Sequence, residues 1–199
     1  VDVQRQDNSD LYAFDGLSKF DIIQPGDLIH CDFGISYLTL NTDTQELGYI
    51  LKPGETKAPE YLINALKEGN RVQDIFTNNF VVGVSGNEIL KKSLEEGRDE
   101  GLRPSIYTHP LGTYGHSAGT TIGMWDSQGG VPFTGDYPLQ YNTAYAIELN
   151  TTVYIEEWKK DIRIMLEVPG FFGKDGFRYI KGRQTEYILI GPNQEGLTY

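Results

Sequence analysis

Apolar and polar residues alternate along several short segments of the chain, as expected for β-strands that bury one face. Glycine, proline and asparagine residues separate these segments and mark turns. The predicted strands cover residues 28–33, 35–40, 46–51, 105–108, 143–149, 151–155, 162–168, 177–180 and 184–190. We expect the last two to form a hairpin around Lys181 and Gly182, and residues 1–27 to be irregular.

Two segments instead repeat apolar residues every three or four positions, which predicts amphipathic helices. The first begins at Pro59 and extends for about five turns. The second covers residues 86–97, and Ser85 and Glu88 have the spacing of a capping box at its start. The chain therefore belongs to the α+β class, and its 199 residues are enough for one domain.

Three carboxylates stand out within apolar predicted strands, and one more stands out beyond a strand end. They are Asp32, Glu148 and Glu186, with Asp43 beyond a strand. A carboxylate within an apolar strand is unfavourable unless it is paired or coordinates a cation. Asp32 could instead cap a turn or meet an arginine, and this segment alone does not separate the two readings.

The stretch HPLGTYGHSAGTTIGMWD, residues 109–126, contains His109 and His116, two of the three histidines of the chain. It has too little aliphatic bulk to form a core. We interpret it as a glycine-rich turn that delivers an imidazole to one point. His109 could equally make a hydrogen bond that stabilises this loop.

The formal net charge of −11 argues against nucleic acid or an anionic membrane surface as a partner. Cys31 is the single cysteine, so a disulfide framework or a cysteine-based zinc cluster is excluded. No run of residues reaches the length of a membrane span, and we expect no signal peptide, because the first residues are polar. We expect a soluble, cytoplasmic protein.

The acids and the glycine-flanked histidine together form an oxygen-rich set with one nitrogen. Oxygen-rich ligands suit Mn²⁺, Fe²⁺, Co²⁺ or Zn²⁺. The predicted metal ligands are Asp32, Asp43, His116, Glu148 and Glu186. Five ligands exceed the need of one catalytic zinc, and bridging carboxylates suit two ions about 3.5–4 Å apart that activate a water.

Four motifs resemble those of the pita-bread metallopeptidases, the superfamily of methionine aminopeptidase, aminopeptidase P, prolidase and creatinase. They are GDLIHCDFG with the aspartate of NTDTQ, GHSAG at 115–119, AIELN at 146–150 and RQTEYILI at 183–190. The motifs occur in the family order and cover most of the chain from residue 26 onward. HP-x-G-x-x-GH-x-x-G and GRQTE are similar to patterns of a subgroup acting on Xaa-Pro peptides.

The resemblance implies a pita-bread fold, with a curved, mostly antiparallel sheet and helices packed on its outer face. Family domains place a helix pair before the first aspartate motif, and only 31 residues precede Asp32. We therefore expect residues 1–199 to be a single metal-binding domain that lacks this pair. We also expect it to be the C-terminal part of a longer protein.

The resemblance also implies a role for each ligand. Asp32 would bind one ion, and Asp43 and Glu186 would bridge both. His116 and Glu148 would complete the other ion, with Glu148 also accepting a proton. Glu167 competes with Glu186 for the last position, because prolidase-like members place their acid in an Arg-Ile-Glu strand. Glu186 is preferred because QTEY matches the aminopeptidase pattern.

The chain departs from the family at its helper histidines. Trp125 stands before Asp126, where a second histidine is expected, and residues 1–29 contain none. His109, as a catalytic residue, or His30 could take over this role. Trp125 could form a wall of the substrate pocket or simply pack.

The resemblance implies a hydrolase with two divalent ions, of which Mn²⁺ is the first expectation, that removes the N-terminal residue of short peptides, including Xaa-Pro peptides. One alternative keeps the fold and metals but changes the chemistry to creatinase-like hydrolysis or a lyase. Another is a non-catalytic pita-bread binding module. A homodimer is a family expectation.

Overall fold

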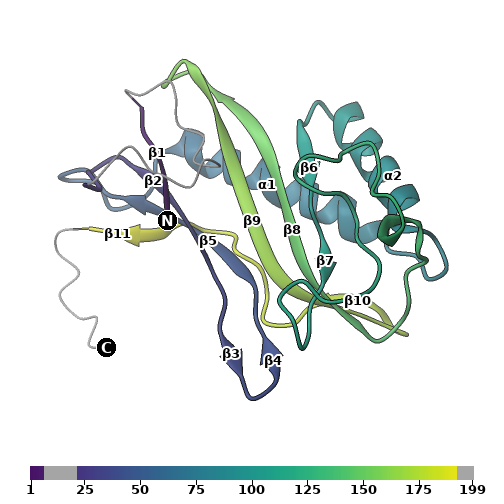
Figure 1. Cartoon of the computed structure of the whole chain (residues 1–199). Coiled ribbons are helices and arrows are strands. Elements are labelled where there is room, and N and C mark those ends of the chain that lie inside the picture. The colour runs from purple at the N-terminus through teal and green to yellow at the C-terminus, as the bar shows by residue number, and fades with distance from the viewer. Residues whose placement is uncertain (7–21, 192–199) are drawn as a thin grey trace.

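The computed structural model of the chain describes residues 1–6 and 22–191. A nine-stranded sheet with the central order β1-β2-β5-β9-β8-β6 runs through it (Figure 1). Its strands are β1 (Asp2–Gln4), β2 (Leu28–Phe33), β5 (Thr44–Ile50), β6 (Pro104–Ile106), β7 (His109–Pro110), β8 (Thr143–Ile155), β9 (Lys160–Gly173), β10 (Gly176–Tyr179) and β11 (Ile188–Ile190). Only β11 pairs in parallel, with β5; every other pair in this sheet is antiparallel.

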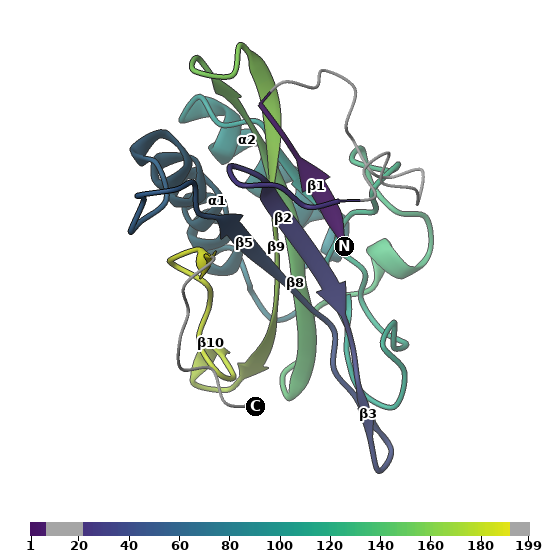
Figure 2. The same cartoon turned by 90° about the vertical axis from the view of Figure 1, so that its left-hand side faces the viewer.

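Two helices, α1 (Glu60–Asn78) and α2 (Gly86–Asp99), cover one face of the curved sheet (Figures 1 and 2). On β8, Tyr145, Ile147 and Leu149 are buried and belong to the same core cluster as the apolar side chains of the helices. Gly69 lets α1 approach β9, because a Cβ there would lie 2.7 Å from Cγ2 of Ile164. Glu148, between these core residues in the sequence, therefore points to the other face of β8.

The predicted α+β class and the curved sheet with helices on its outer face are confirmed. Both helices lie where the periodicity places them. Ser85 caps α2 in the predicted capping box, and Pro59 is the N-cap of α1. No helix among the described residues has both the length and the apolar character needed to cross a membrane.

Several predicted strand boundaries are wrong. Residues 35–40 do not form one strand, because Leu38 has a positive φ of 56° and turns the chain between β3 (Ser36–Tyr37) and β4 (Leu40–Asn41). Residues 143–149 and 151–155 form the single strand β8, which pairs with β9 along its whole length. A short 3₁₀-helix, Thr134–Asp136, precedes it.

The predicted hairpin around Lys181 and Gly182 is also wrong. The strand before this turn, β10, pairs with β9, and the strand after it, β11, pairs with β5. Buried contacts hold the crossing segment: Gln184 exchanges two hydrogen bonds with the backbone of Leu47, at 2.8 and 2.7 Å. Local pattern finds such strands, but it does not tell which distant strand each one joins.

The N-terminal segment contains one unpredicted strand. β1 pairs with β2, with Asp2 opposite His30. The expectation of an irregular segment over 1–27 is therefore wrong for Asp2–Gln4, and its central part, residues 7–21, lies outside the described residues.

Candidate metal centre

Four polar side chains form a row across the middle of the sheet. Asp32 on β2 stands opposite Gln45 on β5, Gln45 stands opposite Glu167 on β9, and Glu167 stands opposite Glu148 on β8. Directly opposed residues on neighbouring strands point to the same face. Asp43 lies two residues before Gln45 and joins them. Three acids of this row thus meet because of strand register, although 135 positions separate the first from the last.

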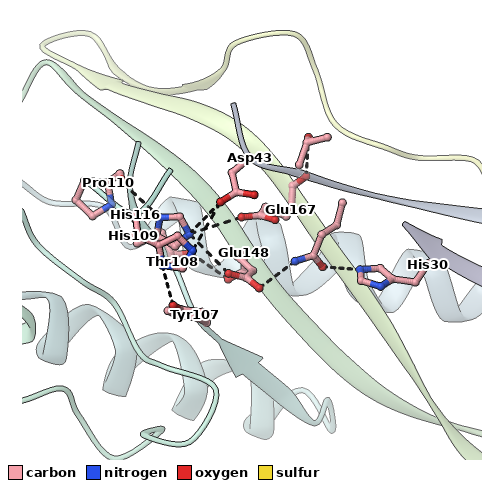
Figure 3. A network of polar contacts seen from close by, with 11 residues as sticks. His30, Asp43, Tyr107, Thr108, His109, Pro110, His116, Glu148 and Glu167 are labelled. Atoms are coloured by element: carbon pink, nitrogen blue, oxygen red, sulfur yellow. Dashed lines mark hydrogen bonds and ion pairs between the residues drawn. The ribbon is translucent and has the colours of Figure 1, made fainter. Parts of the chain in front are cut away.

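Two histidines enter this row from the adjoining edge. His109 lies on β7 opposite Ala146, and His116 lies in the following glycine-rich loop. Their rings stack with centroids 3.9 Å apart and an interplanar angle of 21°. In Figure 3 both imidazoles face the carboxylates of Asp43, Glu148 and Glu167.

The distances from the Nε2 atoms place His109 at the centre of the group. Its Nε2 lies 3.9 Å from Asp43, 3.8 Å from Glu148 and 3.7 Å from Glu167. Nε2 of His116 lies 3.7 Å from Asp43. His109 is 3% exposed, so water does not surround its ring, whereas His116 is exposed.

The other ring nitrogen of each histidine already has a partner. Nδ1 of His109 lies 3.2 Å from the carbonyl oxygen of Pro110, and Nδ1 of His116 lies 3.0 Å from the hydroxyl of Tyr107. A carbonyl only accepts, so Nδ1 of His109 carries a hydrogen, and Nε2 is the ring nitrogen that could offer a lone pair to a cation among the acids. A histidine that binds a metal through one ring nitrogen usually makes such a hydrogen bond with the other.

Two buried atoms at the centre of the group have no hydrogen-bond partner: Nε2 of His109 and Oε1 of Glu167. Leaving both atoms unsatisfied is unfavourable. A divalent cation between these atoms removes this cost. The donor set fits one, because three overlapping triads have ligand atoms within 4.8 Å of one another: Asp43, His109 and His116; His109, Glu148 and Glu167; and Asp32, Asp43 and Glu167.

The crowding of acids shifts their protonation. Burial, followed by repulsion from Glu167, raises the pKa of Glu148 to about 9. Burial also raises the pKa of Glu167, and burial together with Asp43 raises the pKa of Asp32. Burial, then His109, lowers the pKa of His116. Without a cation the group therefore favours uncharged side chains, and a cation would favour the ionised ligand forms.

A cleft of about 330 Å³ opens onto the group. It is lined by Asp2, His30, Asp32, Asp43, Gln45, Ser105, Tyr107, His116, Trp125, Glu148, Leu149, Asn150, Met165 and Glu167. Trp125 is 61% exposed and forms part of this wall. The reading of Trp125 as a pocket wall therefore fits the structure better than the reading as ordinary packing.

The structure brings together four of the five predicted ligands, Asp32, Asp43, His116 and Glu148. It does not bring Glu186 to them: this side chain is exposed and does not line the cleft. The strand that follows it, β11, pairs with Gly48–Ile50, beyond the part of β5 that adjoins the acids. Glu167, the rival acid, occupies the centre instead.

Gln45 and Tyr107 were not among the predicted site residues. Gln45 lies in NTDTQ, two positions after Asp43, so strand alternation could have placed it on the same face. Tyr107 lies two residues before His109, between β6 and β7, and in the predicted strand 105–108, where the same reasoning applies. Neither residue type signals metal chemistry by itself.

No family model matches the chain, and no curated protein matches it. Several solved structures do match the chain. An X-Pro aminopeptidase from Thermotoga maritima matches with a TM-score of 0.62 and 21% identity, over 84% of this chain and 43% of its own. A dipeptidase from Pyrococcus horikoshii matches with a TM-score of 0.60 and 18% identity, over 84% of this chain and 42% of its own. A methionine aminopeptidase from Rickettsia prowazekii matches with a TM-score of 0.57 and 13% identity, over 79% of this chain and 65% of its own.

The chain has the pita-bread fold. The pita-bread structures share at most 21% of their residues with it in these three comparisons, so the likeness is one of fold. The chain spans less than half the length of the first two proteins. In the pita-bread fold of this chain, Asp32, Gln45, Glu148, Glu167 and His116 line one cleft, and the buried His109 lies behind it against the same acids.

Proposed function

We propose that this chain is the metal-binding part of a hydrolase that uses two divalent ions to remove the N-terminal residue of short peptides, with Xaa-Pro peptides as the first class to test. The observation that carries the proposal is the buried, unpaired Nε2 of His109 facing Asp43, Glu148 and Glu167. Structures with this fold include an X-Pro aminopeptidase and a dipeptidase.

The overlapping triads suggest how two ions would be held. Asp43, His109 and Glu167 each belong to two triads, and of these only the two carboxylates have a second oxygen with which they could contact both ions. Asp32 would complete one ion, and His109, His116 and Glu148 would complete the other. Relative to the sequence prediction, Glu167 takes the place of Glu186, and His109 becomes a ligand. Mn²⁺ is the first candidate, followed by Zn²⁺, Co²⁺ and Fe²⁺.

A pair of divalent ions supplies an activated water and polarises a peptide carbonyl. The side chain best placed to take the proton is Glu148. Its Oε1 accepts a hydrogen bond from Gln45 at 2.9 Å, and its Oε2 faces the centre of the group.

The charge of the cleft favours substrates with a free amino terminus. Five carboxylates line it, and no lysine or arginine does so among residues 1–6 and 22–191. Two divalent ions would balance four of the five negative charges and leave room for an ammonium group. A peptide carboxylate would lack the arginine or lysine partner that usually binds it. Longer peptides should therefore be preferred over dipeptides.

The test compares Glu167→Gln with Glu186→Gln in protein loaded with Mn²⁺. We expect Glu167→Gln to lose most of the bound metal and at least about 100-fold in turnover of an Xaa-Pro peptide, because a central ligand is lost. Glu186→Gln should match the wild type. Metal content is measured by mass spectrometry, and cleavage is followed for a dipeptide and for a hexapeptide with the same first two residues.

Different failures have different meanings. Loss of metal in Glu186→Gln with full binding in Glu167→Gln would overturn the ligand assignment. A wild-type protein that binds no divalent metal would overturn the proposed function. Bound metal without cleavage of either peptide would favour the non-peptidase chemistry.

A further inference from the structure

A line of three polar contacts leads from the edge of the sheet to Glu148. Oδ2 of Asp2 lies 3.3 Å from Nδ1 of His30, and Nε2 of His30 lies 2.8 Å from Oε1 of Gln45. Nε2 of Gln45 then donates to Oε1 of Glu148 at 2.9 Å. The four residues come from β1, β2, β5 and β8. Figure 3 shows His30 at the far end of the line from the two histidines of the metal centre.

The chemistry of the two ends fixes the orientation of the Gln45 amide. A cation would hold Glu148 in its ionised form, which only accepts, so the group of Gln45 that faces it is the NH₂. The amide oxygen therefore faces His30, whose Nε2 carries the hydrogen. A flipped amide would set its oxygen against the Glu148 carboxylate and its NH₂ against the Nε2 hydrogen of His30. His30 and Gln45 are 5% and 4% exposed, so water does not replace these bonds.

We infer that Gln45 is a positioning residue for Glu148, with His30 holding its amide in the required orientation. This inference rests on the proposed function. The two oxygens of Glu148 have different partners: Oε1 accepts from Gln45, and Oε2 lies 3.8 Å from Nε2 of His109. Gln45 thereby presents one defined oxygen of Glu148 to the metal centre.

A purely structural role would be filled better by an apolar residue. Leu47 and Tyr49 follow Gln45 at alternate positions of β5, and both are fully buried. A buried amide at this position needs its hydrogen bonds satisfied, and those bonds lead to the metal centre at one end. Residues that orient metal ligands in this way typically change metal affinity or activity by about 10- to 100-fold when lost.

The experiment measures Mn²⁺ affinity by competition with a fluorescent chelator, so it does not depend on peptide cleavage. Gln45→Leu should weaken Mn²⁺ binding by about 10- to 100-fold. Gln73→Leu is the matched control, because Gln73 is a fully buried glutamine on α1 that does not line the cleft. It should bind Mn²⁺ as the wild type does.

Gln45→Met separates positioning from packing, because it nearly keeps the volume and unbranched shape of the side chain but removes the amide donor. We expect it to weaken Mn²⁺ binding about as much as Gln45→Leu does. His30→Leu should have a smaller effect than Gln45→Leu and add little to it in the double variant, because both act through the same amide. If Gln45→Leu fails to fold, the similarly shaped Gln45→Met and His30→Leu carry the test.

Wild-type affinity in Gln45→Leu, or in Gln45→Met, would overturn the inference and leave the proposed function standing. A wild-type protein that does not bind Mn²⁺ would overturn both. The two failures are therefore distinguished by which sample loses binding.

Discussion

Raising the pH should destabilise the metal-free protein through Glu148. Burial and the neighbouring Glu167 raise the pKa of Glu148 from its usual 4.5 to about 9. The folded chain therefore keeps a proton that the unfolded chain releases near pH 4.5. Between these two values the native state binds more protons, so the free energy of unfolding falls as the pH rises.

The size of this effect follows from the number of protons involved. One proton held only by the native state changes the free energy of unfolding by about 1.4 kcal/mol per pH unit. From pH 5 to pH 7 the loss is therefore roughly 3 kcal/mol, against a total stability of about 5–15 kcal/mol for an ordinary domain. The raised pKa of Glu167 acts in the same direction, whereas the lowered pKa of His116 acts in the opposite direction as His116 loses its proton.

The measurement is guanidinium unfolding at pH 5, 6 and 7 in the presence of a chelator. Glu148→Gln isolates the contribution, because an amide imitates the protonated acid at every pH. The stability of the wild type should fall relative to that of Glu148→Gln by roughly 3 kcal/mol over this range. Glu186→Gln, at an exposed site, should follow the wild type.

Parallel pH profiles for the wild type and Glu148→Gln would refute the reasoning. Saturating Mn²⁺ provides a second check, because metal ligands bind in their deprotonated forms. With Mn²⁺ present, the stability of the wild type should rise with pH over the same range.

Two further substitutions test how the scaffold holds the site. Ser85→Ala removes the side chain that accepts from the backbone of Glu88, and it should cost about 1 kcal/mol in guanidinium unfolding without changing metal affinity. Gly123→Ala should cost at least about 2 kcal/mol, because Gly123 has a φ of +73° and a Cβ there would lie 2.0 Å from the carbonyl oxygen of Ile106. Gly129→Ala is the control, because a Cβ there meets no atom within 4 Å, and it should change stability by less than about 0.5 kcal/mol. Thermal melts of Gly123→Ala and Gly129→Ala compare the two glycine positions directly.

Strand alternation was enough to locate part of the candidate site. Asp32 and Glu148 interrupt apolar strands, and the cost of burying an isolated charge indicates a cation. The capping box at Ser85 and the periodicity of α1 depend on neighbours within a few residues, so they too were predictable.

The choice between Glu167 and Glu186 was not predictable in the same way. Both acids interrupt apolar segments near the C-terminus, and local sequence does not reveal which one meets Glu148. That depends on register: β8 and β9 align Glu148 with Glu167, whereas β11 crosses to the far end of β5. The central position of His109 likewise follows from pairing between β7 and β8, which sequence spacing does not determine.

The row of polar side chains from Asp32 to Glu148 lies where it has a mechanical consequence. β5 and β9 pair at one place, where Gln45 stands opposite Glu167, so this contact joins one half of the sheet to the other. Asp32 and Asp43 belong to the first half, and Glu148 and Glu167 belong to the second. A cation bound among them would clamp the halves at their narrowest junction, as a cross-link does. Proteases would then cut the metal-free protein faster, beginning where the two halves part.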